Sequence, residues 1–504
     1  MQFAGLCVYS LHLYDRFDLG LDFAIFQQAW FLIGHGHLYP VNSVWVAPDP
    51  FAMVPFLKSH FELAMWPIAL IGRVWPSPFS LLVYQDAAIV GLEVVTVLWV
   101  GDVARRHLAD RASDRGVILC QAGALVALLI NPWIYETASF DFHLEPIAAL
   151  LVVAAGRDLY NGRGRRALVW SGLALLCGDV IGLYLVGVGV AALLVWVVGR
   201  RASGSGPADA AALPALVMAG GGLAWVITTS AFGLDQASSL TENYGYLAGV
   251  GPGAKTTLLA IAKGAVRHPS RLGTTLGRSA AHIYGFPATA GVVGLLTPWG
   301  LVMAAVVLLP NALNYFVGYI EPTSSFQSLV VVPFVLVGSV TVLVWAWARA
   351  RTLRMPLRRV LRYAVPVVAL GLLAQTAVLS ATWIPKLGQE WQLVGAPQAQ
   401  ELATALARLP AGAEVVAPPS ILGRFGARRN VYTVVDPHAT FAVRESTVAF
   451  VLTTGQTIDG LDPAALRRDA DLLQSQLGAV PIVSAHGIDV MLWRSDGRKF
   501  VTIG

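Results

Sequence analysis

The sequence predicts a mainly α, polytopic helical membrane protein with a small extracytoplasmic α/β domain at its C-terminus. Of its 504 residues, 56% are hydrophobic and only 13% are charged, about half the roughly 25% found in soluble domains. The mean hydropathy is +0.63, and apolar segments approaching membrane-spanning length recur along the chain. This composition excludes a soluble cytosolic enzyme, a nucleic-acid-binding protein and a disordered scaffold.

Ten apolar segments are predicted to build the membrane domain, residues 1–384. They are residues 81–100, 116–131, 144–156, 167–183, 184–199, 212–231, 281–296, 299–310, 328–348 and 363–381. Several are short for a bilayer and would tilt or pair. The apolar residues 1–13 would make an eleventh span, and we interpret them as a first helix truncated by a start site placed too late.

Arginine clusters predict the orientation of the chain in the plasma membrane. If the spans alternate, sixteen of the 35 Lys and Arg residues fall on one side, which the positive-inside rule makes cytoplasmic. They lie in four groups, within 105–115, 157–166, 200–201 and 349–362. The extracytoplasmic side then receives the loops 14–80, 132–143, 232–280 and 311–327.

Residues 385–504 are predicted to form a separate soluble domain on the extracytoplasmic side. Long apolar runs stop there and the density of charge rises. Segments typical of strands alternate with segments typical of helices. The predicted strands are 415–417, 431–435, 448–452 and 488–493, and the predicted helices are 398–409 and 463–477. About 110 residues suffice for a small α/β domain.

Three aspartates follow the first apolar stretch. Asp15, Asp18 and Asp22 are spaced i, i+3 and i+7, so they share one face if the segment is helical. Neighbouring carboxylates repel one another, which raises at least one pKa. Such a group suits a general base or a site for a divalent cation such as Mg²⁺ or Mn²⁺. The alternative is a set of solvated acids at the membrane surface.

Further ionisable residues lie on the same predicted side of the membrane. His60 stands just ahead of an apolar run, and Asp141, His143 and Glu145 alternate at the start of the predicted span 144–156. Ionisable groups at such positions usually face a cavity or a partner, because burying them alone is costly. For Asp141 the alternative role is to cap the helix that follows.

Two other features place charge inside or beside the membrane. Asp179 interrupts an apolar stretch and needs a partner or a proton. Segment 255–278 is basic and amphipathic, and it would meet anionic headgroups or cradle the phosphate of a lipid-linked substrate. Its cations are Lys255, Lys263, Arg267, Arg271 and Arg278.

Several short motifs occur in a fixed order. They are Asp18 or Asp22 with Gln27, Gln28 and Trp30, then His60-Phe61, then Trp75 to Pro78, and then Phe140 to Glu145. In this order they resemble a family of bacterial predicted membrane proteins of unknown function. That family is grouped with the GT-C glycosyltransferases, multi-spanning enzymes that use lipid-phosphate-linked sugars. The family's Lys-Glu-Asp motif is here Cys177-Gly178-Asp179, so two of its charges are absent.

The resemblance implies a GT-C-like glycosyltransferase that takes a sugar from a polyprenyl-phosphate donor at the extracytoplasmic face. Asp22 or Asp18 would take the proton from an acceptor hydroxyl, and Arg73 or Arg267 would neutralise the leaving phosphate. The implied substrate-binding residues are His60, Asp141, His143, Glu145, Asp179, Arg73 and Arg267. The C-terminal domain would contact a glycan or protein acceptor. We expect the aspartate base, His60, Asp141 and His143 to converge beneath that domain, beside an apolar groove for the lipid tail.

Two other functions fit the sequence. One is a transporter or flippase of a lipid-linked or small polar substrate, in which Asp86, Glu93 and Asp179 would line a pathway. The other is a non-catalytic membrane protein of envelope assembly. Transporters usually show internal duplication, whereas this chain has none and its acids gather on one face, which favours the enzyme. In each case the expected partners include membrane lipids and exclude nucleic acid.

Overall fold

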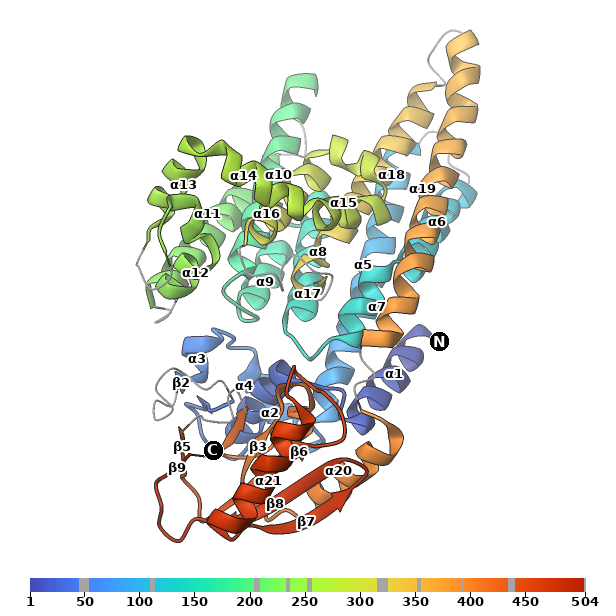
Figure 1. Ribbon diagram of the computed structural model, residues 1–504. Helices are drawn as coiled ribbons and strands as arrows, with labels where there is room; N and C mark the ends of the chain where they lie inside the picture. Colours follow the sequence, from blue (N-terminus) through green and yellow to red (C-terminus); the bar gives the residue numbers. More distant parts are fainter. Residues whose placement is uncertain are drawn as a thin grey trace. The chain divides into compact units, whose positions relative to one another are not determined.

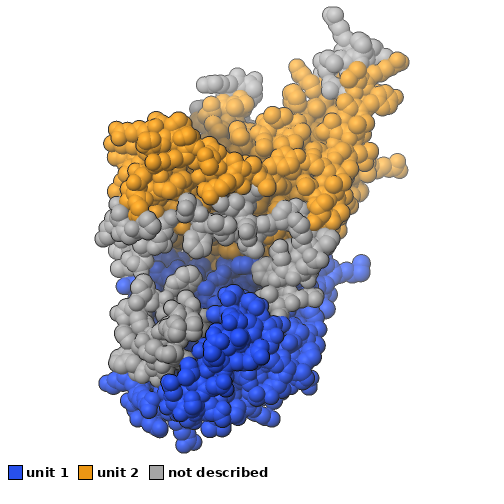
Figure 2. Space-filling view, in the orientation of Figure 1, with its two compact units in different colours: residues 1–86, 139–143, 387–504 blue, residues 87–138, 144–386 orange. Residues whose placement is uncertain are grey.

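The computed structural model divides the chain into two compact units. It describes residues 1–44, 54–108, 114–203, 209–232, 236–251, 256–314, 325–350, 355–390, 394–433 and 440–502. Unit 1 comprises residues 1–86, 139–143 and 387–504, and unit 2 comprises residues 87–138 and 144–386 (Figure 2). The units therefore do not follow the predicted division at residue 384. The first 86 residues belong instead to the same unit as the C-terminal segment.

Within the described residues, five helices are long and apolar enough to cross a membrane. The first is α5 (Phe79–Leu108). Three others are parts of longer helices: Ile181–Gly199 in α10 (Ile181–Ser203), Ala211–Thr229 in α11 (Asp209–Phe232) and Arg362–Thr382 in α19 (Met355–Glu390). The fifth, Phe326–Ala350, combines most of α17 (Ser325–Ser328) with α18 (Val331–Ala350). A sixth would be the pair α6 (Asp114–Leu129) and α7 (Pro132–Ser139), which is bent by 46°. The predicted polytopic helical class is confirmed, with about half the predicted number of long spans.

The other predicted spans form helices too short to cross on their own. They are α1 (Gln2–Arg16), α8 (Glu145–Tyr160), α9 (Gly164–Leu175) and α16 (Pro298–Leu313). An α-helix of 16 residues is about 24 Å long, less than the roughly 30 Å hydrocarbon core. Of these four, α16 is apolar along its length, and the Thr297 side chain caps its start by accepting from Gly300 N.

The predicted span 281–296 does not exist as one helix. Helix α15 (Ala280–Thr289) stops, and a separate 3-10 turn, η1 (Val292–Leu296), follows it. Between them Gly291 adopts φ +85°, a left-handed value that glycine tolerates far better than other residues. Hydropathy alone could not reveal this turn, because its residues are as apolar as those of a span.

Two of the predicted cytoplasmic arginine clusters meet within unit 2. Arg157 Nε donates to Asp102 Oδ2 at 2.8 Å, and the Arg106 guanidinium lies 4.0 Å from the centre of the Tyr160 ring. Within the 157–166 group, Arg166 Nε also lies 3.2 Å from Asp158 Oδ2. The C-terminal ends of α5 and α8 therefore lie together. Arg111, Arg351 and Arg354 lie outside the described residues.

The basic segment 255–278 forms two helices, because Pro269 starts a new one. These are α13 (Leu258–Arg267) and α14 (Pro269–Arg278), and they follow α12 (Gln236–Ala248). Lys255 is outside the described residues. The other cations of the segment are exposed, and Arg271 donates to the Tyr246 carbonyl at 3.1 Å.

The N-terminal part of unit 1 packs against the C-terminal segment. It contains α1, α2 (Leu21–Gly34), β1 (Val41–Asn42), β2 (Val54–Pro55), α3 (Phe56–Ser59) and α4 (Met65–Ile71). Gln28 Nε2 donates to the Arg429 carbonyl at 3.0 Å, and Gly423 N donates to the Leu19 carbonyl at 2.9 Å. The Arg424 guanidinium also lies over the rings of two α1-end aromatics, Tyr14 and Phe17.

The C-terminal segment contains the predicted α/β module, built on a five-stranded sheet (Figure 1). The strand order is β4 (Val431–Thr433), β3 (Glu414–Ala417), β6 (Thr447–Thr453), β8 (Ile488–Arg494) and β7 (Val480–Ala485). β4, β3 and β6 run parallel, whereas β8 is antiparallel to both β6 and β7. A separate pair, β5 (Thr440–Ala442) and β9 (Phe500–Thr502), is antiparallel. The four predicted strands are present.

Two helices complete the module and bury its core. α20 (Ala396–Arg408) packs against β7 and β8, and α21 (Pro463–Leu477) packs on β6 and β8. The buried cluster between α21 and the sheet includes Phe450, Trp493 and Leu466. A carboxylate cap at Asp462, which accepts from Ala464 N, and the left-handed Gly478 set the two ends of α21.

Candidate active site

The three N-terminal aspartates do not share a helix face, contrary to the prediction from their spacing. Helix α1 ends at Arg16, Phe17 adopts a left-handed φ of 61°, and α2 begins only at Leu21. Asp15 stays exposed at the end of α1, Asp18 is buried in the turn, and Asp22 lies in the first turn of α2. The break gives each carboxylate its own surroundings.

Asp141 holds the first turn of α2 from a distant part of the chain. Its Oδ1 accepts the Gly20 N–H at 2.8 Å and its Oδ2 accepts the Phe23 N–H at 3.1 Å. Gly20 is the N-cap residue of α2 and Phe23 its third residue, so one carboxylate satisfies two backbone donors that the helix itself leaves open. Asp141 thus caps α2, and not the helix that follows it in sequence.

Asp22 pairs with His143. His143 Nε2 lies 3.5 Å from Asp22 Oδ2, and the Asp22 side chain is 32% exposed whereas that of His143 is 7% exposed. His143 Nδ1 lies 3.1 Å from the Asp141 carbonyl oxygen, and its backbone N–H donates to Gln85 Oε1 at 2.8 Å. With Nδ1 donating to that carbonyl, Nε2 can donate to Asp22 only when the ring is protonated. The geometry therefore suits an imidazolium–carboxylate pair.

An aromatic framework holds the two histidine rings. The Phe26 ring lies 5.4 Å from the His60 ring and 5.4 Å from the His143 ring, in edge-on contact with each. Phe56 stacks on His60 with ring centres 5.6 Å apart, and its ring also contacts that of Phe26. These rings give the site an apolar wall, which strengthens the electrostatic interactions beside it.

The two carboxylates of the site differ in their pKa. For Asp22, burial by surrounding atoms raises the pKa, but the hydrogen bond and charge of His143 and the charge of His60 outweigh it, so the pKa lies below its usual value. For Asp141, burial and then the charge of Asp22 raise the pKa to about 6, although the Gly20 and Phe23 N–H groups oppose the rise. Asp22 therefore stays ionised to a lower pH than Asp141 does.

Asp18 has a structural position. Its side chain is buried, and its Oδ1 accepts the backbone N–H of Val394 at 3.1 Å. Val394 stands just before α20, so Asp18 ties the end of α1 to the start of the C-terminal module. Of the two candidate bases, only Asp22 combines partial exposure with a histidine contact.

The remaining predicted site residues lie elsewhere. Arg73 Nε donates to the Gly34 carbonyl, at the far end of α2, about 18 Å along the helix from Asp22. Glu145, Asp179 and Arg267 belong to unit 2. There Asp179 Oδ1 accepts the Val180 N–H at 2.9 Å. Their roles in binding stay predictions.

No group of three or more His, Cys, Asp or Glu side chains is placed to hold a metal ion within the part of the chain that the structure describes. The aspartate site for a divalent cation loses its geometric basis because α1 ends before Asp18. A cation requirement stays a prediction.

Two further residues shape the site, and neither is among the predicted site residues. Gln85 fixes the backbone of His143, and Phe26 contacts both histidine rings. A polar Gln85 beside Asp86 in an apolar run was a usable signal. Asp86 itself accepts from Ser10 Oγ at 3.0 Å, which ties α5 to α1. Nothing in the pattern around Phe26 distinguishes it from an ordinary core residue.

Comparisons with known proteins bear on the whole chain. A sequence model of the family described as "Predicted membrane protein (DUF2079)" matches residues 13–449. Among solved structures, ArnT from Cupriavidus metallidurans bound to undecaprenyl phosphate is similar at 14% sequence identity, over 97% of each chain and with a TM-score of 0.43. None of the curated proteins matches the sequence.

Proposed function

This chain belongs to the DUF2079 family of predicted membrane proteins, and from that premise we propose that it is a membrane glycosyltransferase acting at the extracytoplasmic face. The donor is a polyprenyl-phosphate sugar, as the resemblance of its motifs to the GT-C group implies. The observation that carries the proposal is the Asp22–His143 pair: a partly exposed, ionised carboxylate held by a buried histidine and an apolar wall.

In the proposed step, Asp22 acts as general base. The acceptor hydroxyl oxygen forms a bond to the anomeric carbon, while the bond from that carbon to the phosphate oxygen of the donor breaks. The hydroxyl proton passes to Asp22, and the electron pair leaves with the polyprenyl phosphate. His143, when protonated, supplies positive charge beside the reacting atoms. A single displacement of this kind inverts the configuration at the anomeric carbon.

Asp141 and Phe26 are positioning residues in this scheme. Asp141 fixes the first turn of α2, on which Asp22 stands, and Phe26 fixes the two histidine rings. The loop at Pro419 and Ser420 approaches the same turn, since a Cβ on Gly20 would lie 3.4 Å from the Pro419 carbonyl oxygen. This loop is where the C-terminal module would reach an acceptor glycan or protein.

The test compares Asp22→Asn with Asp15→Asn. Membranes containing each variant receive a panel of radiolabelled polyprenyl-phosphate sugars, and transfer of label out of the lipid fraction is measured. Loss of a general base should lower the rate by about 10²–10⁴-fold in Asp22→Asn. Asp15→Asn removes an exposed carboxylate from the preceding helix and should match the wild type. Equal transfer in all three, or no transfer above membranes lacking the protein, would contradict the proposal.

A further inference from the structure

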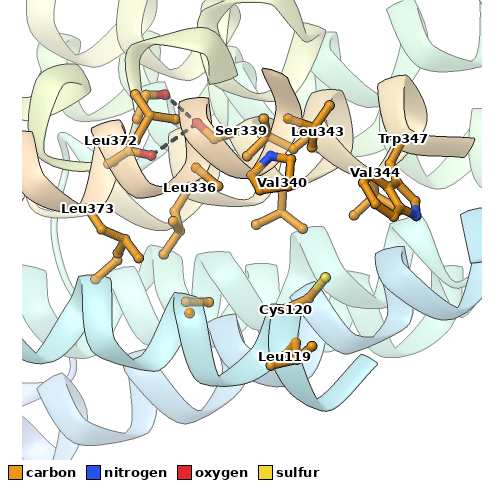
Figure 3. A pocket seen from close by; sticks show the side chains of 18 of the residues that line it. Leu119, Cys120, Leu336, Ser339, Val340, Leu343, Val344, Trp347, Leu372 and Leu373 are labelled. Carbon is orange, nitrogen blue, oxygen red and sulfur yellow. Dashed lines mark hydrogen bonds between the residues drawn. The ribbon is translucent and has the colours of Figure 1, made fainter. Parts of the chain in front are cut away.

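Unit 2 contains an apolar groove of about 400 Å³ between its long helices (Figure 3). Three helices provide most of its wall: α6, α18 and α19. In Figure 3, Leu119 and Cys120 of α6 lie opposite Val340 and Val344 of α18. Residues Thr289 to Gly291, in the turn after α15, also line the groove.

The groove exists because α19 is tied to its neighbours through its C-terminal half. Thr376 donates to the Thr289 carbonyl at 2.9 Å, and Ser380 donates to the Ile130 carbonyl. The other half of α19 faces small residues on α6. Gly123 is one of them, and a Cβ there would meet no atom within 4 Å. The hydrogen bonds hold the C-terminal half of α19 against its neighbours. Beside the N-terminal half of α19, the small side chains of α6 leave a gap.

The side chains that line the groove favour a hydrocarbon chain as its occupant. Leucine, valine and alanine side chains make up most of it, and its hydroxyls already bond to backbone carbonyls. Ser339 Oγ lies 3.0 Å from the Ala290 carbonyl oxygen and 2.9 Å from that of Val335. A lining this poor in available polar groups favours apolar chains over ordered water.

The open end of the groove is basic. Arg115 adjoins the lining residue Gly116, and Arg362 stands one helical turn before the lining residue Val365. The described cations at this end are Arg115, Arg349, Arg359 and Arg362, and Asp114 is an acid beside them. These arginines belong to two of the clusters that the positive-inside rule assigns to the cytoplasm.

We infer that this groove binds an anionic phospholipid of the cytoplasmic leaflet. One acyl chain lies between α6, α18 and α19, and the phosphate meets Arg115 and Arg362. Charge complementarity selects the occupant, because basic pockets between spanning helices attract anionic headgroups. A neutral lipid would fill the apolar part without using the arginines. The inference does not rest on the proposed transferase activity.

The experiment measures which lipid stays on the full chain. The protein is reconstituted in bilayers of phosphatidylcholine and phosphatidylglycerol at equal amounts, extracted in mild detergent, and its retained lipid is identified by mass spectrometry. Phosphatidylglycerol should exceed phosphatidylcholine. Arg115→Gln and Arg362→Gln should each lower that ratio by about fivefold, the effect of roughly one phosphate–arginine contact at a membrane surface. Arg165→Gln, an exposed arginine on α9, is the matched charge control and should leave the ratio unchanged.

A second pair of variants tests the apolar part. Ala369→Trp puts a ring into the groove, whereas Leu370→Trp puts the same ring on the exposed side of the next residue. Ala369→Trp should no longer retain lipid, whereas Leu370→Trp should retain as much lipid as the wild type. Both should elute as monodisperse protein with wild-type helical content, which separates loss of binding from loss of folding.

Three results would overturn the inference. They are retention of the two lipids in the bilayer ratio by the wild type, unchanged retention by Ala369→Trp, and displacement of phosphatidylglycerol by added polyprenyl phosphate at equal concentration. The last would assign the groove to the donor lipid. Transfer activity is not measured in this experiment, so failure here leaves the proposed function standing.

Discussion

At the scale of single residues, surroundings decide what each of three aspartates can do. Asp15, Asp18 and Asp22 lie within eight residues, yet one is exposed, one is buried against Val394 and one faces His143. Their spacing predicted a cluster because it assumed a continuous helix. The left-handed Phe17 defeats that assumption, and an aromatic residue carries no sequence signal for such a conformation.

Asp141→Ala tests the capping role of Asp141. The variant leaves the Gly20 and Phe23 N–H groups of α2 without their acceptor, which should cost about 1–2 kcal/mol. We expect a lower thermal midpoint in detergent, measured by tryptophan fluorescence. Asp15→Ala, on the exposed end of α1, should leave the midpoint unchanged. A midpoint for Asp141→Ala equal to that of the wild type would show that the cap does not stabilise α2.

Because Glu414 is buried, we expect the thermal stability of the C-terminal module to depend on pH. Burial raises its pKa to about 7, although the Arg444 N–H donates to it at 2.7 Å. A carboxylate whose folded pKa lies above its unfolded pKa stabilises the fold most in acid, and that contribution is lost as the pH rises from about 4.5 through 7. Glu414→Gln keeps the shape without the charge.

Glu414→Gln should therefore unfold at a higher temperature than the wild type at pH 8, by about 2–4 °C, and the difference should vanish at pH 4. Differential scanning fluorimetry across this range gives the comparison. Asp471→Asn, which removes an exposed carboxylate from α21, is the control for loss of a negative charge elsewhere in the module. The opposite sign at pH 8 would mean that Glu414 is stabilised as the anion.

At the scale of elements, the sequence predicts well where local chemistry sets the ends. Helix 463–477 has its predicted bounds because Asp462, Pro463 and Gly478 mark both termini. Strand β7 went unpredicted because it contains Pro481 and lies exposed at the edge of the sheet, so it lacks the buried pattern of its neighbours. The predicted span 281–296 was wrong for a different reason. Its residues are continuously apolar, so the pattern does not reveal that the helix ends before Gly291.

Gly291→Ala tests that break. The alanine Cβ would need the left-handed φ of 85° and would lie 2.7 Å from Ser339 Oγ. We expect destabilisation by about 1–3 kcal/mol, seen as a lower thermal midpoint. Gly371→Ala, in α19 with no atom within 4 Å of its Cβ, should be neutral or slightly stabilising because alanine favours helix. Equal midpoints for the two variants would show that the turn at Gly291 can rearrange.

At the scale of the whole molecule, three separate stretches of chain form the candidate site: the start of α2, the residue after α3, and segment 139–143. Asp22, His60 and His143 come from the first 86 residues and from segment 139–143, which share unit 1 with the C-terminal module. The sequence predicted that these groups gather near that module, because all of them fell on one side of the membrane. It could not predict the compact unit itself, since hydrogen bonds such as Gln28 to Arg429 join residues about 400 positions apart.

The proposed site requires the C-terminal module to be extracytoplasmic, and two exposed turns allow a direct test. A protease site inserted at Gly497, in the turn before β9, should be cut in intact spheroplasts and protected in inverted vesicles. The same site inserted at Gly162, between α8 and α9 beside the arginine cluster, should show the reverse. Each insertion thus controls for the other. If the site at Gly497 were cut only in inverted vesicles, the C-terminal module would be cytoplasmic, and a base at Asp22 in the same unit would have no access to a donor sugar outside the cell.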